Sequence, residues 1–148
     1  MRFILAATVV VLSVLNCTSP KTDLDQPSNP KEHAMQIQYL EIVTKDVDAV
    51  CAIYAAANGL QFSEPVAGFG NARTAPLLGG GMVGVRAPMR ESEEPVVRPY
   101  WLVGDIESAV AAAVDRGGEV AHPPMQIPGG GTFAIYIQGG IEHGLWQR

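Results

Sequence analysis

The stretch RPYWLVGDIESAVAAAVDRGGEVAH, residues 98–122, has a counterpart in YLEIVTKDVDAVCAIYAAANGLQF, residues 39–62. Asp46 matches Asp105 at an offset of 59 residues (105 − 46), and the same offset continues to the end of the chain without a gap. It also aligns Gly59 with Gly118, Gly70 with Gly129, and Gly80-Gly81 with Gly139-Gly140. A fixed period of this kind indicates an internal repeat, and the sequence therefore predicts two similar modules.

Each module is predicted to contain a strand, a helix and three further strands. MQIQYLEIV alternates apolar and polar residues, as a half-buried strand does. Asp46 is a plausible N-cap for the helix that follows, and Gly59 is a stop signal at its end. LQFSEPV, GNARTAPL and GMVGVRAP are then three strand-like stretches separated by turns that carry glycine. The modules cover about residues 36–88 and 96–148, with a polar, proline-bearing linker between them.

The N-terminus has the pattern of an export signal. Arg2 precedes an apolar run of roughly 13 residues, whereas a membrane-spanning helix needs about 20. The sequence Val14-Leu15-Asn16-Cys17 resembles the bacterial lipobox, although the family prefers Gly, Ala or Ser where this chain has Asn16. We therefore expect a signal peptide at 1–16, lipidation of Cys17, and an exported lipoprotein on the periplasmic side of the cell envelope. Residues 17–35, rich in Pro, Ser and Asp, are expected to be a disordered tether.

Composition restricts the class of protein. With 148 residues, 47% of them hydrophobic, one globular domain is expected, at 36–148. The net charge of −5, without a basic run, argues against nucleic acid as a partner. Cys51 lies in an apolar helical pattern and has no disulfide partner if Cys17 is lipidated, so a buried thiol is predicted. The membrane is expected to be contacted through the lipid anchor alone, and a homodimer is left open.

Paired βαβββ units of this size resemble the vicinal oxygen chelate superfamily, which includes glyoxalase I, bleomycin-resistance proteins, fosfomycin-resistance enzymes and extradiol dioxygenases. The resemblance covers residues 36–148 and is carried by the two repeated stretches and by the terminal GLWQ. An aspartate-proline-glycine turn common in relatives is replaced by Ile137-Gln138-Gly139-Gly140. The resemblance implies an α+β fold. In it, two βαβββ modules form a cupped, eight-stranded, incomplete barrel with its helices on the convex side.

The resemblance also implies a divalent metal, held by His, Glu or Gln on the first and last strands of each module. This chain has Tyr39, Arg98, Val85 and Gly144 at those positions. A permanently charged arginine would repel a dication, and glycine and valine offer no ligand atom. We therefore expect neither the family metal site nor another cofactor. A divalent metal on an unusual set drawn from Glu41, Glu142 and His143 stays as the alternative.

Strand alternation predicts which side chains line the cup. If the family positions face inward, six side chains converge there: Tyr39, Glu41, Arg98, Tyr100, Glu142 and Trp146. Arg98 is expected to contact Glu41 or Glu142, and to direct its guanidinium at an acidic or carbonyl group of the ligand. The alternative for Tyr100 and Trp146 is that they only pack in the hydrophobic core and do not bind a ligand. His122 and His143 are expected to have structural or solvent-exposed roles.

Three functions remain open. The first is an envelope-anchored protein that binds a small molecule in the cup, as in the bleomycin-resistance branch, without transforming it. The second is a metal-independent enzyme of lyase, isomerase or dioxygenase-like type, with Glu41 or Glu142 as general base and Arg98 stabilising negative charge. The third is an enzyme with an atypical metal site. The sequence does not decide between the first two, because a carboxylate near an arginine serves both.

Overall fold

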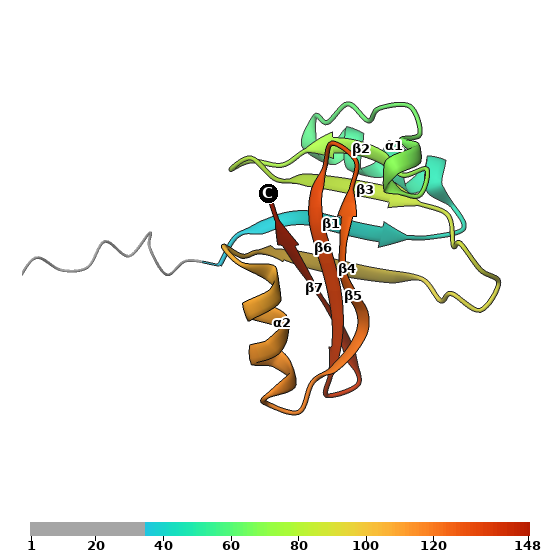
Figure 1. Ribbon diagram of the computed structural model, residues 1–148. Helices are drawn as coiled ribbons and strands as arrows, with labels where there is room; N and C mark the ends of the chain where they lie inside the picture. The colour runs from blue at the N-terminus through green and yellow to red at the C-terminus, as the bar shows by residue number, and fades with distance from the viewer. Residues whose placement is uncertain (1–34) are drawn as a thin grey trace, which may run out of the picture. The chain divides into compact units, whose positions relative to one another are not determined.

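The computed structural model describes residues 35–148, which form one seven-stranded mixed sheet with two α-helices (Figure 1). The sheet order is β2-β3-β1-β4-β7-β6-β5. The N-terminal module contains β1 (Ile37–Val43), α1 (Val47–Asn58), the short 3₁₀ helix η2 (Ala67–Phe69), β2 (Arg73–Pro76) and β3 (Met82–Arg86). The C-terminal module contains β4 (Val96–Leu102), α2 (Ile106–Val114), β5 (Glu119–Ile127), β6 (Gly131–Gln138) and β7 (Ile141–Gln147).

The element boundaries reproduce the repeat that the sequence predicts. β1 and β4 begin and end 59 residues apart (96 − 37 and 102 − 43). The two helices begin at the same offset (106 − 47), as do the last strands of the modules, β3 and β7 (141 − 82). Strands β1 and β4 pair with each other antiparallel at the centre of the sheet, and this ladder joins the two modules. The predicted α+β, two-module fold is confirmed, with an open sheet that does not close into a barrel.

The described residues contain seven strands rather than the predicted eight, because LQFSEPV is not a regular strand. This segment runs beside β2, and the Ser63 amide donates to the Thr74 carbonyl at 2.8 Å. The hydrogen bond in the opposite direction ends on a side chain, because the Thr74 amide donates to Ser63 Oγ at 3.0 Å. A serine hydroxyl that replaces a carbonyl in this way competes with the regular ladder. Pro65 follows and has no amide to donate.

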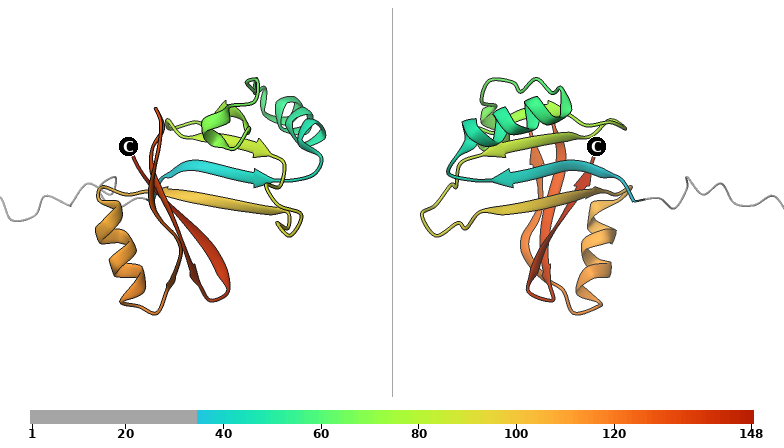
Figure 2. Two further views of the ribbon diagram at one scale, coloured as in Figure 1. Left: turned by 45° about the vertical axis from the view of Figure 1, so that its right-hand side comes forward. Right: turned by 180° about the vertical axis from the view of Figure 1, so that it is seen from behind.

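Both helices pack on the outer face of the sheet, as predicted (Figure 2). α1 contacts β3, and α2 contacts β5, β6 and β7. One apolar cluster lies under each helix, around Val83 and Val85 in the N-terminal module and around Ile106 and Leu145 in the C-terminal module. A third cluster lies on the inner face and is mainly aromatic, with Tyr39, Tyr100 and Trp146 buried at its centre. The inner face is therefore part core and part cavity wall.

The predicted signal peptide, the lipidation site at Cys17 and nearly all of the tether lie outside the described residues. Within residues 35–148, neither helix has the length and hydrophobicity needed to cross a membrane. Cys51 is a buried free thiol, as predicted.

Candidate functional site

The inner face encloses a cavity of about 590 Å³. All six residues predicted to line the cup line this cavity: Tyr39, Glu41, Arg98, Tyr100, Glu142 and Trp146. They come from β1, β4 and β7, so both modules contribute to one site. The antiparallel register of β1 and β4 places Glu41 beside Arg98 and Tyr39 beside Tyr100. The alternation of the strands is therefore as predicted at these positions.

Arg98 contacts both carboxylates that the sequence offered as partners. Its Nη1 donates to Glu41 Oε2, and its Nη2 donates to Glu142 Oε2. The Arg98 side chain is 7% exposed and that of Glu41 is 8% exposed, whereas that of Glu142 is 42% exposed. Arg98 therefore links a buried carboxylate to a half-exposed carboxylate. The expectation that it contacts Glu41 or Glu142 is confirmed.

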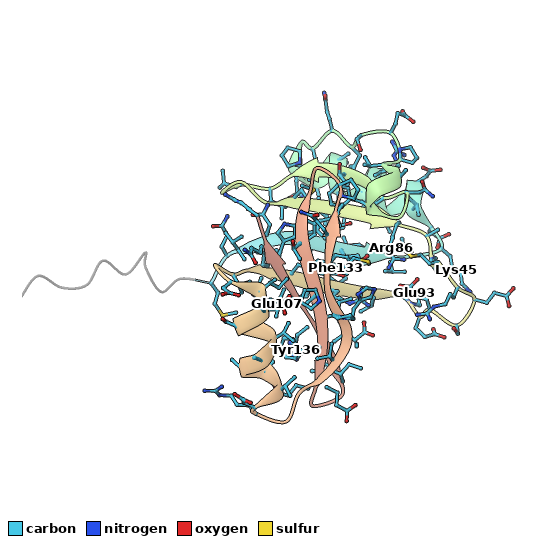
Figure 3. All side chains as sticks on the ribbon, in the orientation of Figure 1. Lys45, Arg86, Glu93, Glu107, Phe133 and Tyr136 are labelled. Carbon is cyan, nitrogen blue, oxygen red and sulfur yellow. The ribbon has the colours of Figure 1, made fainter. Side chains whose placement is uncertain are left out.

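A second arginine, Arg86 at the end of β3, binds the other side of Glu41. Arg86 Nε donates to Glu41 Oε1 at 2.7 Å, and both terminal nitrogens donate to Glu93, at 2.7 and 2.9 Å. Figure 3 shows Arg86 and Glu93 beside each other. Glu93 lies in the linker between the modules and also accepts the Met89 amide at 2.7 Å. The five charged residues therefore alternate in sign, in the order Glu93, Arg86, Glu41, Arg98, Glu142.

Neither Arg86 nor Glu93 is predicted from the sequence. The repeat makes Val85 the inward mate of Gly144, but Val85 packs in the cluster under α1, and Arg86 lines the cavity. The offset of 59 aligns β3 with β7 in sequence, but the inward positions of these strands differ by one residue. Gly84 indicates which residues of β3 face inward, because the Tyr39 ring fills the space that a Cβ would need at this position. Glu93 has no comparable signal because it lies in a loop.

Aromatic rings form the wall of the cavity. Trp146 is 1% exposed and stacks on Phe69, with ring centroids 6.0 Å apart. Tyr100 meets Trp146 edge-on at 6.0 Å, and Tyr39 lies 5.5 Å from Tyr100. Burial, followed by the nearby carboxylate of Glu41, raises the pKa of both tyrosines far above the ordinary value. Both hydroxyls are therefore neutral at physiological pH, and Tyr100 donates to Glu41 Oε2 at 3.2 Å.

The charges in this cluster stabilise one another. Burial opposes the charged guanidinium of Arg98, but Tyr100 and Glu41 hold its pKa above the ordinary value. Hydrogen bonds from Arg86 lower the pKa of the Glu93 carboxyl to about 2. Arg98 Nε, however, is buried and has no hydrogen-bond partner among residues 35–148. One donor of this guanidinium is therefore unused in the described structure.

The residues at the family's metal positions do not fit a divalent cation. Tyr39 is a neutral phenol, and Arg98 and Arg86 are cations. A side chain at Gly144 is blocked because a Cβ there would lie 2.5 Å from the Tyr100 ring. No group of three or more His, Cys, Asp or Glu side chains within residues 35–148 is arranged to hold a metal. The atypical set does not assemble either, because His143 faces away from the cavity and stacks on Tyr136 at 4.9 Å.

His122, for which a structural or solvent-exposed role is expected, lies on β5. It lines the cavity, and its ring lies 5.0 Å from that of Phe133. The cavity-facing part of β5 begins at Ala121, and irregular pairing with β6 on either side of His122 changes the alternation there. A period of two therefore could not place this residue.

No family model matches the sequence. CFP32 proteins of Mycobacterium bovis and Mycobacterium tuberculosis, whose name assigns them provisionally to the glyoxylases, are 29% identical over 115 residues. The match covers 74% of this chain but only 44% of each relative, so the chain spans less than half of their length.

Solved structures of low sequence identity share the fold. Hypothetical protein BH1468 from Bacillus halodurans has a TM-score of 0.60 and 14% identity, over 78% of this chain and 95% of its own. Methylmalonyl-CoA epimerase from Mycobacterium tuberculosis has a TM-score of 0.58 and 15% identity, over 75% of this chain and 86% of its own. A Streptomyces coelicolor epimerase variant in complex with 2-nitronate-propionyl-CoA has a TM-score of 0.56 and 20% identity, over 75% and 95%. The described residues have the fold of the vicinal oxygen chelate superfamily, and the predicted resemblance is confirmed.

The Glu93–Arg86 pair predicts an acid-sensitive contribution to stability. The folded-state pKa of about 2 is below the ordinary value of 4.5, so the pair stabilises the fold fully above about pH 4.5. This contribution, on the order of 2–3 kcal/mol, should be lost as the pH falls from 4.5 toward 2. Urea unfolding of wild type and Glu93→Gln at several pH values should show a difference at pH 7 that shrinks across this range. A difference that stays constant between pH 7 and 3 would contradict this assignment.

Proposed function

We propose that this protein binds a small molecule in the cup between its modules, and that Arg98 holds an acidic or carbonyl oxygen of that molecule in place of a metal ion. The observation that carries this proposal is a buried guanidinium at a cavity floor, surrounded by aromatic walls from both modules. Ligand cavities usually combine apolar walls with a few fixed polar groups. The names of the relatives, a glyoxylase and a CoA-ester epimerase, support a small organic ligand.

The second candidate is a metal-independent enzyme with Glu142 as general base. A general base must be able to accept a proton, and Glu41 is poorly suited because both of its oxygens accept hydrogen bonds from arginines. Glu142 accepts one hydrogen bond from Arg98 and is half-exposed in the cavity wall. Its position beside Arg98 would allow the guanidinium to stabilise negative charge that develops on the substrate. Binding is the better-supported function, because it uses the arginine alone.

Replacing Arg98 with methionine tests the proposal. Methionine keeps much of the side-chain length but removes the charge, so ligand binding should fall by about 100-fold or more. Thermal shifts of the wild type should identify binders in a library of organic acids and carbonyl compounds, and these shifts should disappear in Arg98→Met. Arg116→Met is the matched control, because Arg116 is exposed at the end of α2 and contacts the Ala112 carbonyl. Binders that shift both variants equally would contradict the role of Arg98.

A metal series in the same assay tests the remaining alternative, which is an enzyme with an atypical metal site. We expect Zn²⁺, Mn²⁺, Ni²⁺ and Fe²⁺ to leave the melting temperature unchanged, and a chelator to do the same. A metal atom present at one equivalent after purification, whose removal lowers the melting temperature, would favour the atypical metal enzyme.

We infer from the N-terminal sequence that the protein is exported and anchored in the bacterial envelope through lipid on Cys17. Two or more acyl chains on one residue give stable anchoring, whereas one chain gives only reversible binding. Palmitate labelling and membrane association should therefore be lost in Cys17→Ser. The variant Cys51→Ser is the matched control and should keep both. Unchanged labelling in Cys17→Ser would disprove the lipoprotein assignment.

A further inference from the structure

We infer that the ligand is a monocarboxylate with a flat, apolar body, and that Glu142 is a resident carboxylate which this ligand displaces from Arg98. The inference deepens the binding function proposed above and rests on it. It follows from three features of the cavity: which charged groups have partners that can be exchanged, which donor of Arg98 is unused, and what the walls are made of.

Only one carboxylate of the charged cluster can be exchanged at little cost. Arg86 uses all three of its nitrogens, toward Glu41, Glu93 and the Ala87 carbonyl. Glu41 accepts from Arg86, Arg98 and Tyr100, so both of its oxygens are occupied. Removing one of these charged partners would leave a buried opposite charge incompletely compensated, which is unfavourable. The remaining contact of the cluster is the one between Arg98 and Glu142.

Glu142 is placed so that it can leave. It is the second residue of β7 and is separated from the turn at Gly139-Gly140 only by Ile141. Its side chain is 42% exposed, against 15% or less for the other four charged residues of the cluster. A carboxylate that already contacts water regains its hydration when it rotates away, so its release costs little. A ligand carboxylate in its place keeps the net charge of the floor the same.

The unused donor of Arg98 gives the ligand an advantage over Glu142. Nε and Nη2 lie on the same edge of a guanidinium, and a free carboxylate can accept from both in a planar fork. Glu142 accepts from Nη2 alone, and Nε is buried without a partner among the described residues. A ligand that is not tied to β7 can approach this edge squarely. It would satisfy the unpaired donor as well as replace the lost contact.

The walls define the rest of the ligand. Aromatic rings from both modules surround the floor, so a flat apolar body would gain contact area and stacking. Glu41 and Glu93 lie in the same cavity and oppose a second negative charge near the floor. Of the two other arginines that line the cavity, Arg86 is already paired with Glu41 and Glu93, and Arg90 is exposed. One carboxylate at the floor is therefore favoured over two.

Calorimetric titrations with benzoate and indole-3-acetate test the inference, with benzamide and indole-3-acetamide as uncharged counterparts. Glu142→Gln removes the competing charge and keeps the shape, so it should bind the carboxylates about tenfold more tightly than wild type does. The amides should bind more weakly than the acids, with the same affinity in both proteins. Glu119→Gln is the matched control, because Glu119 is exposed on β5 and lies outside the cavity. It should bind like wild type.

Equal or weaker carboxylate binding in Glu142→Gln would overturn the displacement. The proposed function would stand in that case if library binders are still lost in Arg98→Met. Amides that bind as tightly as the acids would overturn the monocarboxylate assignment, and so would the absence of saturable carboxylate binding in both wild type and Glu142→Gln. A dicarboxylate such as phthalate that binds more tightly than benzoate would also overturn it.

Discussion

Truncating Glu41 to alanine should lower the free energy of unfolding by about 3–5 kcal/mol, because it leaves two buried arginines without their shared counter-charge. Glu41 accepts Arg86 Nε on one oxygen and Arg98 Nη1 on the other, and all three side chains are at most 8% exposed. Neither guanidinium can lose its proton at any practical pH. With only Glu93 and Glu142 left as partners, the two positive charges must stay in the interior incompletely compensated or draw water into it.

Urea or thermal unfolding followed by circular dichroism measures this loss. Glu64→Ala is the matched control, because Glu64 is exposed and its side chain makes no hydrogen bond to the described residues. It should change the free energy of unfolding by about 0.5 kcal/mol or less. Glu41→Gln, which keeps the shape and one acceptor, should lose less than Glu41→Ala, and it remains measurable if the alanine variant does not fold. A loss below about 1 kcal/mol in Glu41→Ala would show that the cluster is not buried as described.

Trp146→Ala should cost a similar amount, about 3–5 kcal/mol, through a cavity rather than a charge. Trp146 is the largest side chain that is fully buried in the described part of the chain. Its ring contacts Phe69, Tyr39 and Tyr100, which come from three different segments. These rings are held by their own strands and turns, so they cannot move in to fill the space.

Ile53→Ala is the comparison for this variant, because Ile53 is an apolar residue on α1 that is 65% exposed. It should change the free energy of unfolding by about 0.5 kcal/mol or less. A Trp146→Ala protein as stable as Ile53→Ala would mean that the aromatic cluster does not support the fold. Trp146→Phe, which keeps an aromatic ring, should lie between wild type and the alanine variant.

The repeat made most of the fold predictable, because a shared offset fixes the order and spacing of elements even where each motif is weak. The lining of the cup followed from strand alternation on β1, β4 and β7. The prediction was wrong at Val85, because an offset aligns sequence but not the facing of a strand, and the close approach of Gly84 to Tyr39 sets that facing. It was also wrong for LQFSEPV, where a serine side chain replaces part of the backbone ladder.

The sequence alone could not identify the loop residue of the charged cluster, nor decide which carboxylate pairs with Arg98. Glu93 reaches the cluster from the linker, and nothing in APMRESEEPVV separates it from Glu91 or Glu94. Likewise, the sequence could offer Glu41 or Glu142 as the partner of Arg98. Only the structure shows that one guanidinium contacts both.

The charged cluster also bears on how the chain can assemble. Apart from the local pair of Arg86 and Glu93, its contacts join residues 41 and 86, 41 and 98, and 98 and 142, which are separated by 45, 57 and 44 positions. Closing loops of that length carries an entropic penalty before any contact rewards it. Neither half of the duplicated chain holds the whole set, because Glu41 and Arg86 lie in the first half and Arg98 and Glu142 in the second. We therefore expect these charges to stay hydrated until both halves have docked, which makes their desolvation a late event on the folding pathway and leaves an isolated half without its neutral interior.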